Sequence, residues 1–293
     1  MLVSLIVTTR EGRVDRFRRL LSSLNPAVYR FIELIVVSQD CHTVVAPLLE
    51  EYRGKLHIQH IRHISCSIST ARNIGLRHST AQILAFPDDD CWYAPDTIIG
   101  IIERFTTHPE ETFVCTAVFD PLRQLPFGHR RTSKKDVIIS VANAFTLPVS
   151  TGIFINRALI EGPVVFDERL GTGTAWGSGE ETDLILSLLT NGHKGTFLPG
   201  ITVFHEINYD RPDLFPNRQV FDYSRGFGAL IAKSVLERKQ YALTWVYTDL
   251  LARAVIRFVM EGATLRNHSY LRQFSKAKGM LIGLFEGAHY YAR

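Results

Sequence analysis

The sequence has few of the features that mark secreted, membrane-spanning or nucleic-acid-binding proteins. Its four cysteines, at positions 41, 66, 91 and 115, show no CxxC spacing and predict no disulfide framework. The chain begins without a basic and then apolar leader, so a cytoplasmic location is expected. The net charge of +4 is small and scattered over 293 residues, which argues against nucleic acid as a partner.

Membrane-spanning apolar runs are also missing. One long stretch without Asp, Glu, Lys or Arg, residues 137–156, has enough length to cross a bilayer. Asn143, Pro148 and Gly152 interrupt it, which predicts two short buried strands joined by a turn. No internal repeat or Gly/Ser-rich linker divides the chain.

Strand and helix patterns alternate along the first hundred residues. Hydrophobic residues make up 46% of the chain, enough for a large core. The apolar runs predict strands at 2–8, 31–38, 56–61 and 82–86. The helical spacings predict helices at 13–24, 44–52, 69–78 and about 95–105. Such alternation is typical of an α/β fold with a mostly parallel sheet flanked by helices.

The most informative segment is an apolar run that ends in three carboxylates. Ile83–Phe86 is followed by Pro87 and then by Asp88-Asp89-Asp90. Open α/β sheets bind ligands at the carboxyl ends of their strands, and three acids in one pocket require a cation. Oxygen ligands of this kind suit Mg²⁺ or Mn²⁺ held together with a substrate phosphate. The alternative is a solvated acidic turn before the next helix.

Two further polar segments follow predicted strands and should reach the same edge of the sheet. They are Thr8-Thr9-Arg10 and Ser38-Gln39-Asp40. A ligand-binding edge is therefore predicted from Thr8, Thr9, Arg10, Gln39 and Asp40, beside the three acids.

The order of these motifs resembles the family-2 glycosyltransferases of the GT-A fold. The resemblance covers about residues 2–206 and includes an acidic motif on the acceptor side. Its motifs are Ser4–Arg10, Glu33–Val37, Ser69–Leu76, Asp88–Asp90 with Pro95-Asp96, Phe166–Leu170 and Gly177–Leu184. We therefore expect residues 1–206 to form a nucleotide-sugar and acceptor domain of Rossmann-like type, and residues 207–293 a helical C-terminal extension.

The resemblance implies roles for the donor-side residues. Asp90 should be the direct metal ligand, with Asp88 and Asp89 contacting ribose, diphosphate or the ion through water. Arg72 should face the phosphates, and His205, after the strand-like Ile201–Phe204, should complete the metal shell or touch the diphosphate. The cofactor implied is Mn²⁺ or Mg²⁺.

On the acceptor side the resemblance implies a general base. The family usually has Glu-Asp where this chain has Glu180-Glu181, so Glu181 occupies the position of the base and Asp183 is the alternative. The resemblance assigns the nucleotide-base pocket to Thr8, Thr9, Arg10, Gln39 and Asp40. Related chains often have an aspartate directly after the second strand to read the base, whereas this chain has Ser38-Gln39 before Asp40. A UDP-sugar is the favoured donor, with GDP and dTDP left open.

The resemblance implies a metal-dependent inverting glycosyltransferase of polysaccharide biosynthesis, acting on a glycan or lipid-linked acceptor. One alternative is a sugar-nucleotide pyrophosphorylase, but the segment 8–12 is not the glycine-rich phosphate loop such an enzyme needs. Another alternative is a noncatalytic nucleotide-sugar-binding subunit of a polysaccharide assembly complex.

The segment Tyr241–Glu261 has the pattern of an amphipathic helix. Its polar residues are Asp249, Arg253, Arg257 and Glu261. Its apolar face carries Leu243, Val246, Tyr247, Leu250, Leu251, Val255, Phe258 and Val259. We expect this face to pack on the protein or on a second subunit of a homodimer. The alternative is a peripheral contact with the inner face of a membrane, supported by the basic residues Arg266, Arg272, Lys276 and Lys278.

Overall fold

The computed structural model describes residues 1–10, 12–127, 133–206, 217–264 and 269–292. Contacts divide the chain into two units, Met1–Val165 with Asn191–Ile207, and Phe166–Thr190 with Asn208–Arg293. The segment Phe166–Thr190, which the sequence assigns to the first domain, is therefore grouped with the C-terminal helices. Its contacts are made over long sequence separations, which local patterns do not reveal.

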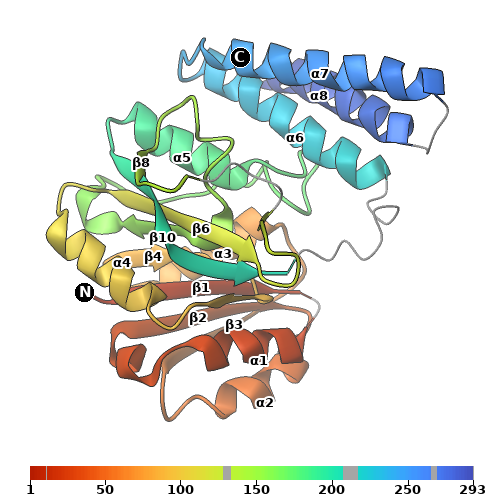
Figure 1. Cartoon of the computed structure of the whole chain (residues 1–293). Helices are drawn as coiled ribbons and strands as arrows, with labels where there is room; N and C mark the ends of the chain where they lie inside the picture. Colours follow the sequence, from red (N-terminus) through yellow and green to blue (C-terminus); the bar gives the residue numbers. More distant parts are fainter. Residues whose placement is uncertain (11, 128–132, 207–216, 265–268, 293) are drawn as a thin grey trace. The chain divides into compact units, whose positions relative to one another are not determined.

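The first unit is built on one mixed sheet (Figure 1). Its order is β3-β2-β1-β4-β9-β6-β10-β5, with β7 beside β6 and β8 beside β10. The strands β1 to β4 are parallel, as the alternation of strands and helices predicts. The strand β9 runs antiparallel to both β4 and β6, and β5 runs antiparallel to β10. The predicted α/β architecture is confirmed, with antiparallel strands on one side of β4.

The ten strands found in the described part of the chain have these bounds: β1 Val3–Thr9, β2 Ile32–Gln39, β3 His57–His63, β4 Ile83–Ala85, β5 Cys91–Tyr93, β6 Phe113–Asp120, β7 Leu125–Pro126, β8 Val137–Ile138, β9 Ile153–Asn156 and β10 Gly195–His205. The helices have these bounds: α1 Val14–Ser23, α2 His42–Glu50, α3 Ile68–His78, α4 Thr97–Thr107, α5 Glu180–Thr190, α6 Asn217–Leu236, α7 Leu243–Thr264 and α8 Ser269–Tyr291.

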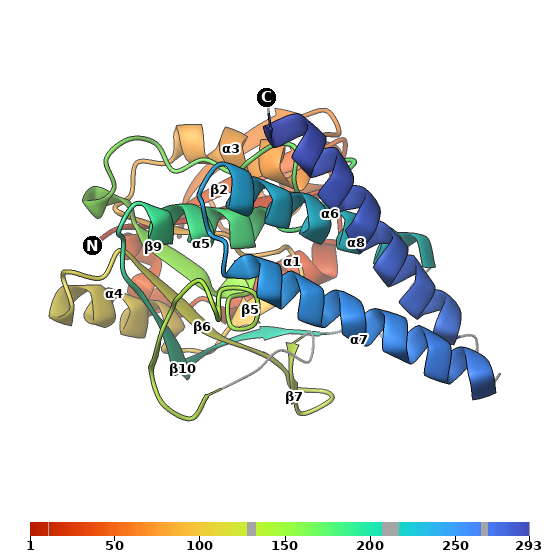
Figure 2. The same cartoon turned by 90° about the horizontal axis from the view of Figure 1, so that it is seen from above.

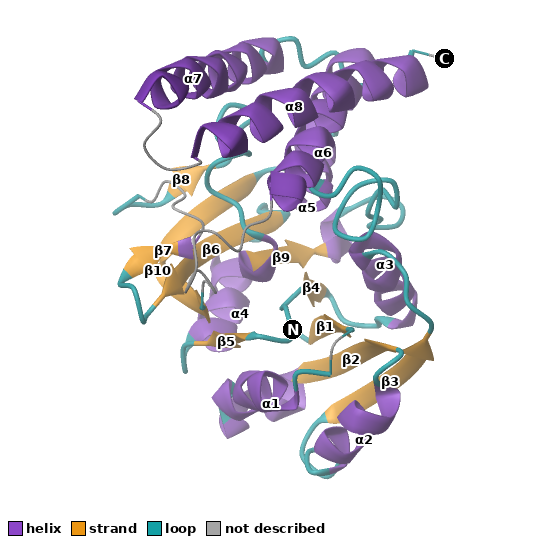
Figure 3. Ribbon diagram, turned by 90° about the vertical axis from the view of Figure 1, so that its right-hand side faces the viewer, coloured by secondary structure: helices purple, strands orange, loops and turns teal. Residues whose placement is uncertain are grey.

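Helices cover both faces of the sheet (Figure 3). The helices α1, α2 and α4 pack on one face through residues such as Leu20, Leu48 and Ile101, and α3 packs on the other through Ala71 and Ile74. A side chain at Gly75 of α3 would overlap Ile6 of β1. This glycine therefore allows α3 to lie close against the centre of the sheet.

The strand β10 runs from Gly195 to His205, and the sequence predicts only its part at 201–204. An irregularity interrupts the strand before that part. Its register against β6 shifts between Leu198 and Thr202, where Pro199 and Gly200 lie. Proline cannot donate to a ladder and is tolerated in strands at such bulges. The bulge lets one strand pair along β6 and still end at His205, opposite Cys91 of β5.

The second unit consists of α5 and a bundle of three helices, α6, α7 and α8, seen in Figure 2. The helices α6 and α8 pack closely against each other, because both helices have glycines in the contact. A side chain at Gly283 would overlap the carbonyl oxygen of Arg225, and one at Gly287 would lie 2.8 Å from the Cα atom of Ala229. The spacing of Gly279, Gly283 and Gly287 places all three on one face of α8, against α6.

The helix α7 forms where the sequence predicts one, but the face that it buries differs in part from the predicted apolar face. Leu243 and Tyr247 are buried as expected, whereas Val255 and Val259 are 45% and 62% exposed. Ala254 is buried in their place. Among the helices of the described residues, none combines the length and hydropathy that crossing a bilayer requires.

Candidate functional site

The three acids lie at the carboxyl end of the central strands. Asp88 follows β4 and forms a parallel bridge with Thr8 at the end of β1. Thr9 donates a hydrogen bond of 2.6 Å from Oγ1 to Oδ2 of Asp89, which is 2% exposed. The segments Thr8-Thr9 and Asp88–Asp90 are therefore together at one edge, as predicted.

Asp88, Asp90 and His205 form a group with the geometry of a metal site. Each offers one ligand atom, and these atoms lie within 4.8 Å of one another. Nε2 of His205 is 3.1 Å from Oδ1 of Asp90 and 3.8 Å from Oδ2 of Asp88. Two carboxylates and an imidazole suit a divalent cation such as Mn²⁺.

The second ring nitrogen of His205 is also used. Nδ1 lies 2.9 Å from the backbone carbonyl oxygen of Glu206, and because that oxygen can only accept, Nδ1 carries the proton. This leaves Nε2 facing the carboxylates, where it donates to Oδ1 of Asp90 when protonated and could bind a cation once that proton is lost. A backbone carbonyl in this position is a common way to fix the tautomer of a metal-binding histidine.

The surroundings of Asp89 and Asp90 give these two neighbouring acids different pKa values. Burial raises the pKa of Asp89 to about 6, against the opposing effects of Thr9 and Arg13. Burial acts in the same direction on Asp90, but His205, Arg13 and Arg16 outweigh it and lower its pKa to about 2. Asp90 is therefore a carboxylate over the whole physiological range, as a metal ligand must be.

His205 responds to the same negative charges. Burial lowers its pKa, but the hydrogen bond to Asp90 and the charges of Asp88 and Asp90 together raise the pKa above its usual value. Surroundings that favour a proton on an imidazole favour any cation. The electrostatics of the group thus agree with its donor atoms in fitting a positive ion.

Among the described residues, three arginines contact the acids. Arg72 on α3 is 1% exposed and its guanidinium lies 3.3 Å from Oδ1 of Asp88. Arg13 lies 3.1 Å from Asp89 and 2.7 Å from Asp90, and Arg16 lies 3.3 Å from Asp90. Sequence reasoning identifies Arg72 but misses Arg13 and Arg16. The i, i+3 spacing of two arginines directly after the first strand is the signal that could find them.

Gln39 and Asp40 lie at the end of β2 and contact the loop that leads into α3. Oε1 of Gln39 accepts a hydrogen bond of 2.8 Å from the backbone of Cys66, and Oδ2 of Asp40 accepts one of 2.9 Å from Ser65. Both side chains therefore hold the loop that precedes α3 against the end of β2. Arg10, the remaining residue of the predicted pocket, is exposed.

Glu181 and Asp183 share the first turn of α5 in the second unit. Asp183 is 4% exposed, and both of its oxygens accept hydrogen bonds from cations. Nζ of Lys233 lies 2.8 Å from one oxygen, and the guanidinium of Arg238 lies 2.7 Å from the other. Glu181 is partly exposed. The two candidate bases therefore have different surroundings.

Lys233 also joins a second acid to this network. Its Nζ lies 2.6 Å from Oδ2 of Asp167, which Arg169 binds through two further hydrogen bonds of 2.7 Å. The network connects α6, α5 and the segment before α5. Sequence reasoning misses Lys233, although a lone cation within the apolar stretch 227–235 indicates a buried ion pair.

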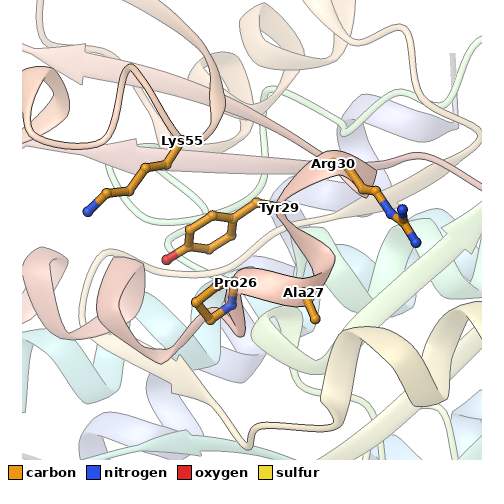
Figure 4. A pocket seen from close by; sticks show the side chains of 5 residues that line it. All are labelled: Pro26, Ala27, Tyr29, Arg30 and Lys55. Carbon is orange, nitrogen blue, oxygen red and sulfur yellow. The ribbon is translucent and has the colours of Figure 1, made fainter.

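A cavity of about 770 Å³ lies at the opposite edge of the sheet (Figure 4). It is lined by Pro26, Ala27, Tyr29 and Arg30, which precede β2, and by Lys55, which precedes β3. These positions are at the amino ends of the parallel strands. Since α/β sheets bind nucleotides at the carboxyl ends, this cavity is not the nucleotide pocket.

Comparison with known families decides the class of protein. The model of glycosyl transferase family 2 matches residues 4–160, more than half of the chain. The chain belongs to glycosyltransferase family 2. It is therefore an enzyme of glycosyl transfer, and the alternatives of a pyrophosphorylase and a noncatalytic subunit are not supported.

Individual relatives of this family-2 glycosyltransferase agree. The succinoglycan biosynthesis protein ExoM of Rhizobium meliloti (strain 1021) is 26% identical over 308 residues, which covers 98% of this chain and 95% of ExoM. The fold is similar to that of the mannosyltransferase PcManGT of Pyrobaculum calidifontis, solved with GDP-Man and Mn²⁺, with a TM-score of 0.64, 16% identity and coverage of 98% of this chain and 87% of that one.

A second solved structure has the same fold. Residues 1–349 of S. aureus TarS, in complex with UDP-GlcNAc, match with a TM-score of 0.59 and 15% identity, covering 100% of this chain and 92% of that one. At this level of identity the two solved structures establish the GT-A fold of the family-2 chain and no finer property.

Proposed function

We propose that this family-2 enzyme is a metal-dependent inverting glycosyltransferase that moves a sugar from a nucleoside-diphosphate donor to an acceptor hydroxyl. The observation that carries the proposal is the group formed by Asp88, Asp90 and His205 at the carboxyl end of the sheet. Its two carboxylates and its tautomer-fixed imidazole are suited to Mn²⁺ or Mg²⁺. A bound cation would offset the negative charge that develops on the departing diphosphate.

The residues of the chain supply the rest of the donor site. Arg72, Arg13 and Arg16 add positive charge beside the acids, which suits a diphosphate. Thr8, Thr9, Arg10, Gln39 and Asp40 form the edge where the nucleoside is expected. Asp89 is held by Thr9 and Arg13 and is not part of the group of possible metal ligands, so we assign it to hydrogen bonding with ribose.

Glu181 is the proposed general base. It takes the proton of the acceptor hydroxyl while the oxygen forms a bond to the anomeric carbon and the bond to the diphosphate breaks. A positioned base contributes roughly 10²- to 10⁴-fold to the rate of such a step. Asp183 is less suited, because accepting a proton would require it to give up hydrogen bonds to Lys233 or Arg238.

The donor and the pathway are proposed from the relatives. TarS is solved with UDP-GlcNAc and PcManGT with GDP-Man, and ExoM is a succinoglycan biosynthesis protein. We propose a UDP-sugar donor, with GDP and dTDP as the alternatives, and a glycan or lipid-linked acceptor in polysaccharide biosynthesis.

The test is release of nucleoside diphosphate from UDP-, GDP- and dTDP-sugars by the purified enzyme, with Mn²⁺, with Mg²⁺ and with EDTA. We expect one nucleotide class to be hydrolysed or transferred, and only with metal present. Undiminished release in EDTA would contradict metal dependence. Proton NMR of the transferred product tests inversion, because retention of the anomeric configuration would exclude the single displacement proposed here.

A further inference from the structure

The helices α7 and α8 carry large apolar side chains that the second unit leaves exposed. The exposed fractions are 81% for Trp245, 57% for Ile256, 62% for Val259, 48% for Phe274, 51% for Leu281 and 75% for Phe285. Single exposed apolar residues are ordinary, but monomeric proteins rarely expose large contiguous patches of them. A set of this size on two neighbouring helices calls for a partner.

The exposed residues lie on one side of each helix. On α8 the residues Leu271, Phe274, Leu281 and Phe285 recur at helical spacing and form a single stripe. The glycines that contact α6, such as Gly283, are on another face of α8. The stripe is therefore a surface that the packing of the bundle does not use.

The stripe on α8 adjoins α7. The ring of Phe274 contacts that of Phe258 on α7, with 5.6 Å between the centroids. On α7 the exposed residues Trp245, Ile256 and Val259 lie opposite the buried Tyr247. We call the exposed apolar residues of both helices, named above, the outer face.

The charges of the two helices favour an anionic partner over a second copy of the chain. Basic side chains exceed acidic ones, and part of the acidic charge is already paired, since Asp249 binds Arg253 and Glu286 binds Arg225. The basic residues within the two helices are Arg253, Arg257, Arg272, Lys276 and Lys278, and the acidic ones are Asp249, Glu261 and Glu286. This excess of basic over acidic residues favours an anionic surface and disfavours pairing of the outer face with its own copy. Arg266 lies outside the described residues.

We propose that the outer face of α7 and α8 binds the surface of an anionic lipid bilayer. Exposed Trp, Phe and Leu side chains on helices that also carry an excess of Lys and Arg are the composition of helices that lie in the interface of a membrane. Lysine side chains can extend past an apolar face and keep their charge at the headgroups. Neither helix is long and apolar enough to cross a bilayer, and the proposal places both along its surface.

The experiment is cosedimentation of the full chain with vesicles of phosphatidylcholine, with and without phosphatidylglycerol. We expect the protein to sediment with the anionic vesicles, less with neutral ones, and less as salt is added, because charge attraction is screened over about 8 to 10 Å. Tryptophan emission should shift to shorter wavelength on binding, and Trp245→Phe should remove most of that shift.

Matched variants separate this surface from a general effect of charge. Phe285→Glu and Ile256→Glu should each reduce vesicle binding by at least about tenfold, since a charge in the apolar face opposes insertion. The control is Ile138 on β8 of the first unit, which is 75% exposed. The variant Ile138→Glu makes the same charge change there and should bind vesicles as the wild type does. Melting temperatures would confirm that all three variants are folded.

Two results would overturn the proposal. One is a wild-type protein that stays in the supernatant with anionic vesicles. The other is a dimer in solution that Phe285→Glu converts to a monomer while vesicle binding is unchanged, since the outer face would then be a contact between two copies. Neither result depends on metal or sugar nucleotide, so each is distinguishable from a failure of the proposed catalytic function.

Discussion

Lys233 on α6 binds Asp183 on α5, with 2.8 Å between Nζ and Oδ2. The same ammonium group lies 2.6 Å from Asp167, and all three side chains are less than a tenth exposed. One buried cation thus joins two buried carboxylates beside the turn that carries Glu181. The position of the proposed base is linked in this way to the stability of the second unit.

Replacing Lys233 with Met should destabilise the protein. Removing one partner of a buried ion pair leaves an uncompensated charge and typically costs about 3–5 kcal/mol. Arg238 and Arg169 still contact the two acids, so the lower end of that range is expected. The free energy of unfolding in urea measures the effect. Lys239→Met, at an exposed position, is the control, and an equal loss there would contradict the structural role of Lys233.

Glu181→Gln and Asp183→Asn should have different effects. Glu181→Gln removes a base but keeps the shape of the side chain, so kcat should fall by roughly 10²- to 10⁴-fold while the KM for the donor stays unchanged. Asp183→Asn should instead lower the melting temperature, because it weakens the contacts with Lys233 and Arg238. If Glu181→Gln retained nearly full activity and Asp183→Asn had none without loss of stability, Asp183 would be the base.

Two helical glycines provide a matched test of the bundle. A side chain at Gly283 of α8 would overlap the backbone of Arg225, so Gly283→Ala should separate α6 from α8 and lower the melting temperature by several degrees. A side chain at Gly262 of α7 would meet no atom within 4 Å among the described residues. There, Gly262→Ala should stabilise the helix by up to about 1 kcal/mol. Equal effects of the two substitutions would contradict the close packing of α6 and α8.

The sequence predicts the parts of the fold that depend on local pattern. The strands β1 to β4 and the helices α1 to α4 follow directly from apolar spacing. The rule that ligands collect at strand ends places Thr9 beside Asp89 before any contact is known. The antiparallel positions of β9 and β5 have no such local signal, because they depend on pairing between distant segments.

The same limit applies to the candidate site. Asp88 and Asp90 could be predicted as neighbours, and the structure brings His205 to them through the bulge in β10. Arg13 is far from Asp90 in the sequence. The two residues are in contact because the start of α1 lies beside the segment that follows β4. The network of Lys233 is signalled only in part, since a lone cation in the apolar stretch 227–235 indicates a buried ion pair but does not identify the acids that it binds.

The most direct test of the central claim is calorimetric titration of UDP into the protein with and without Mn²⁺. The wild type should bind UDP more tightly with Mn²⁺, and Asp90→Asn should reduce that gain by more than about tenfold, since even changes behind the direct ligands cost that much. The variant Asp96→Asn should behave as the wild type does, because Asp96 is exposed before α4 and its side chain makes no capping hydrogen bond there. If Asp90→Asn kept the full Mn²⁺-dependent gain, Asp88, Asp90 and His205 would not be the metal site.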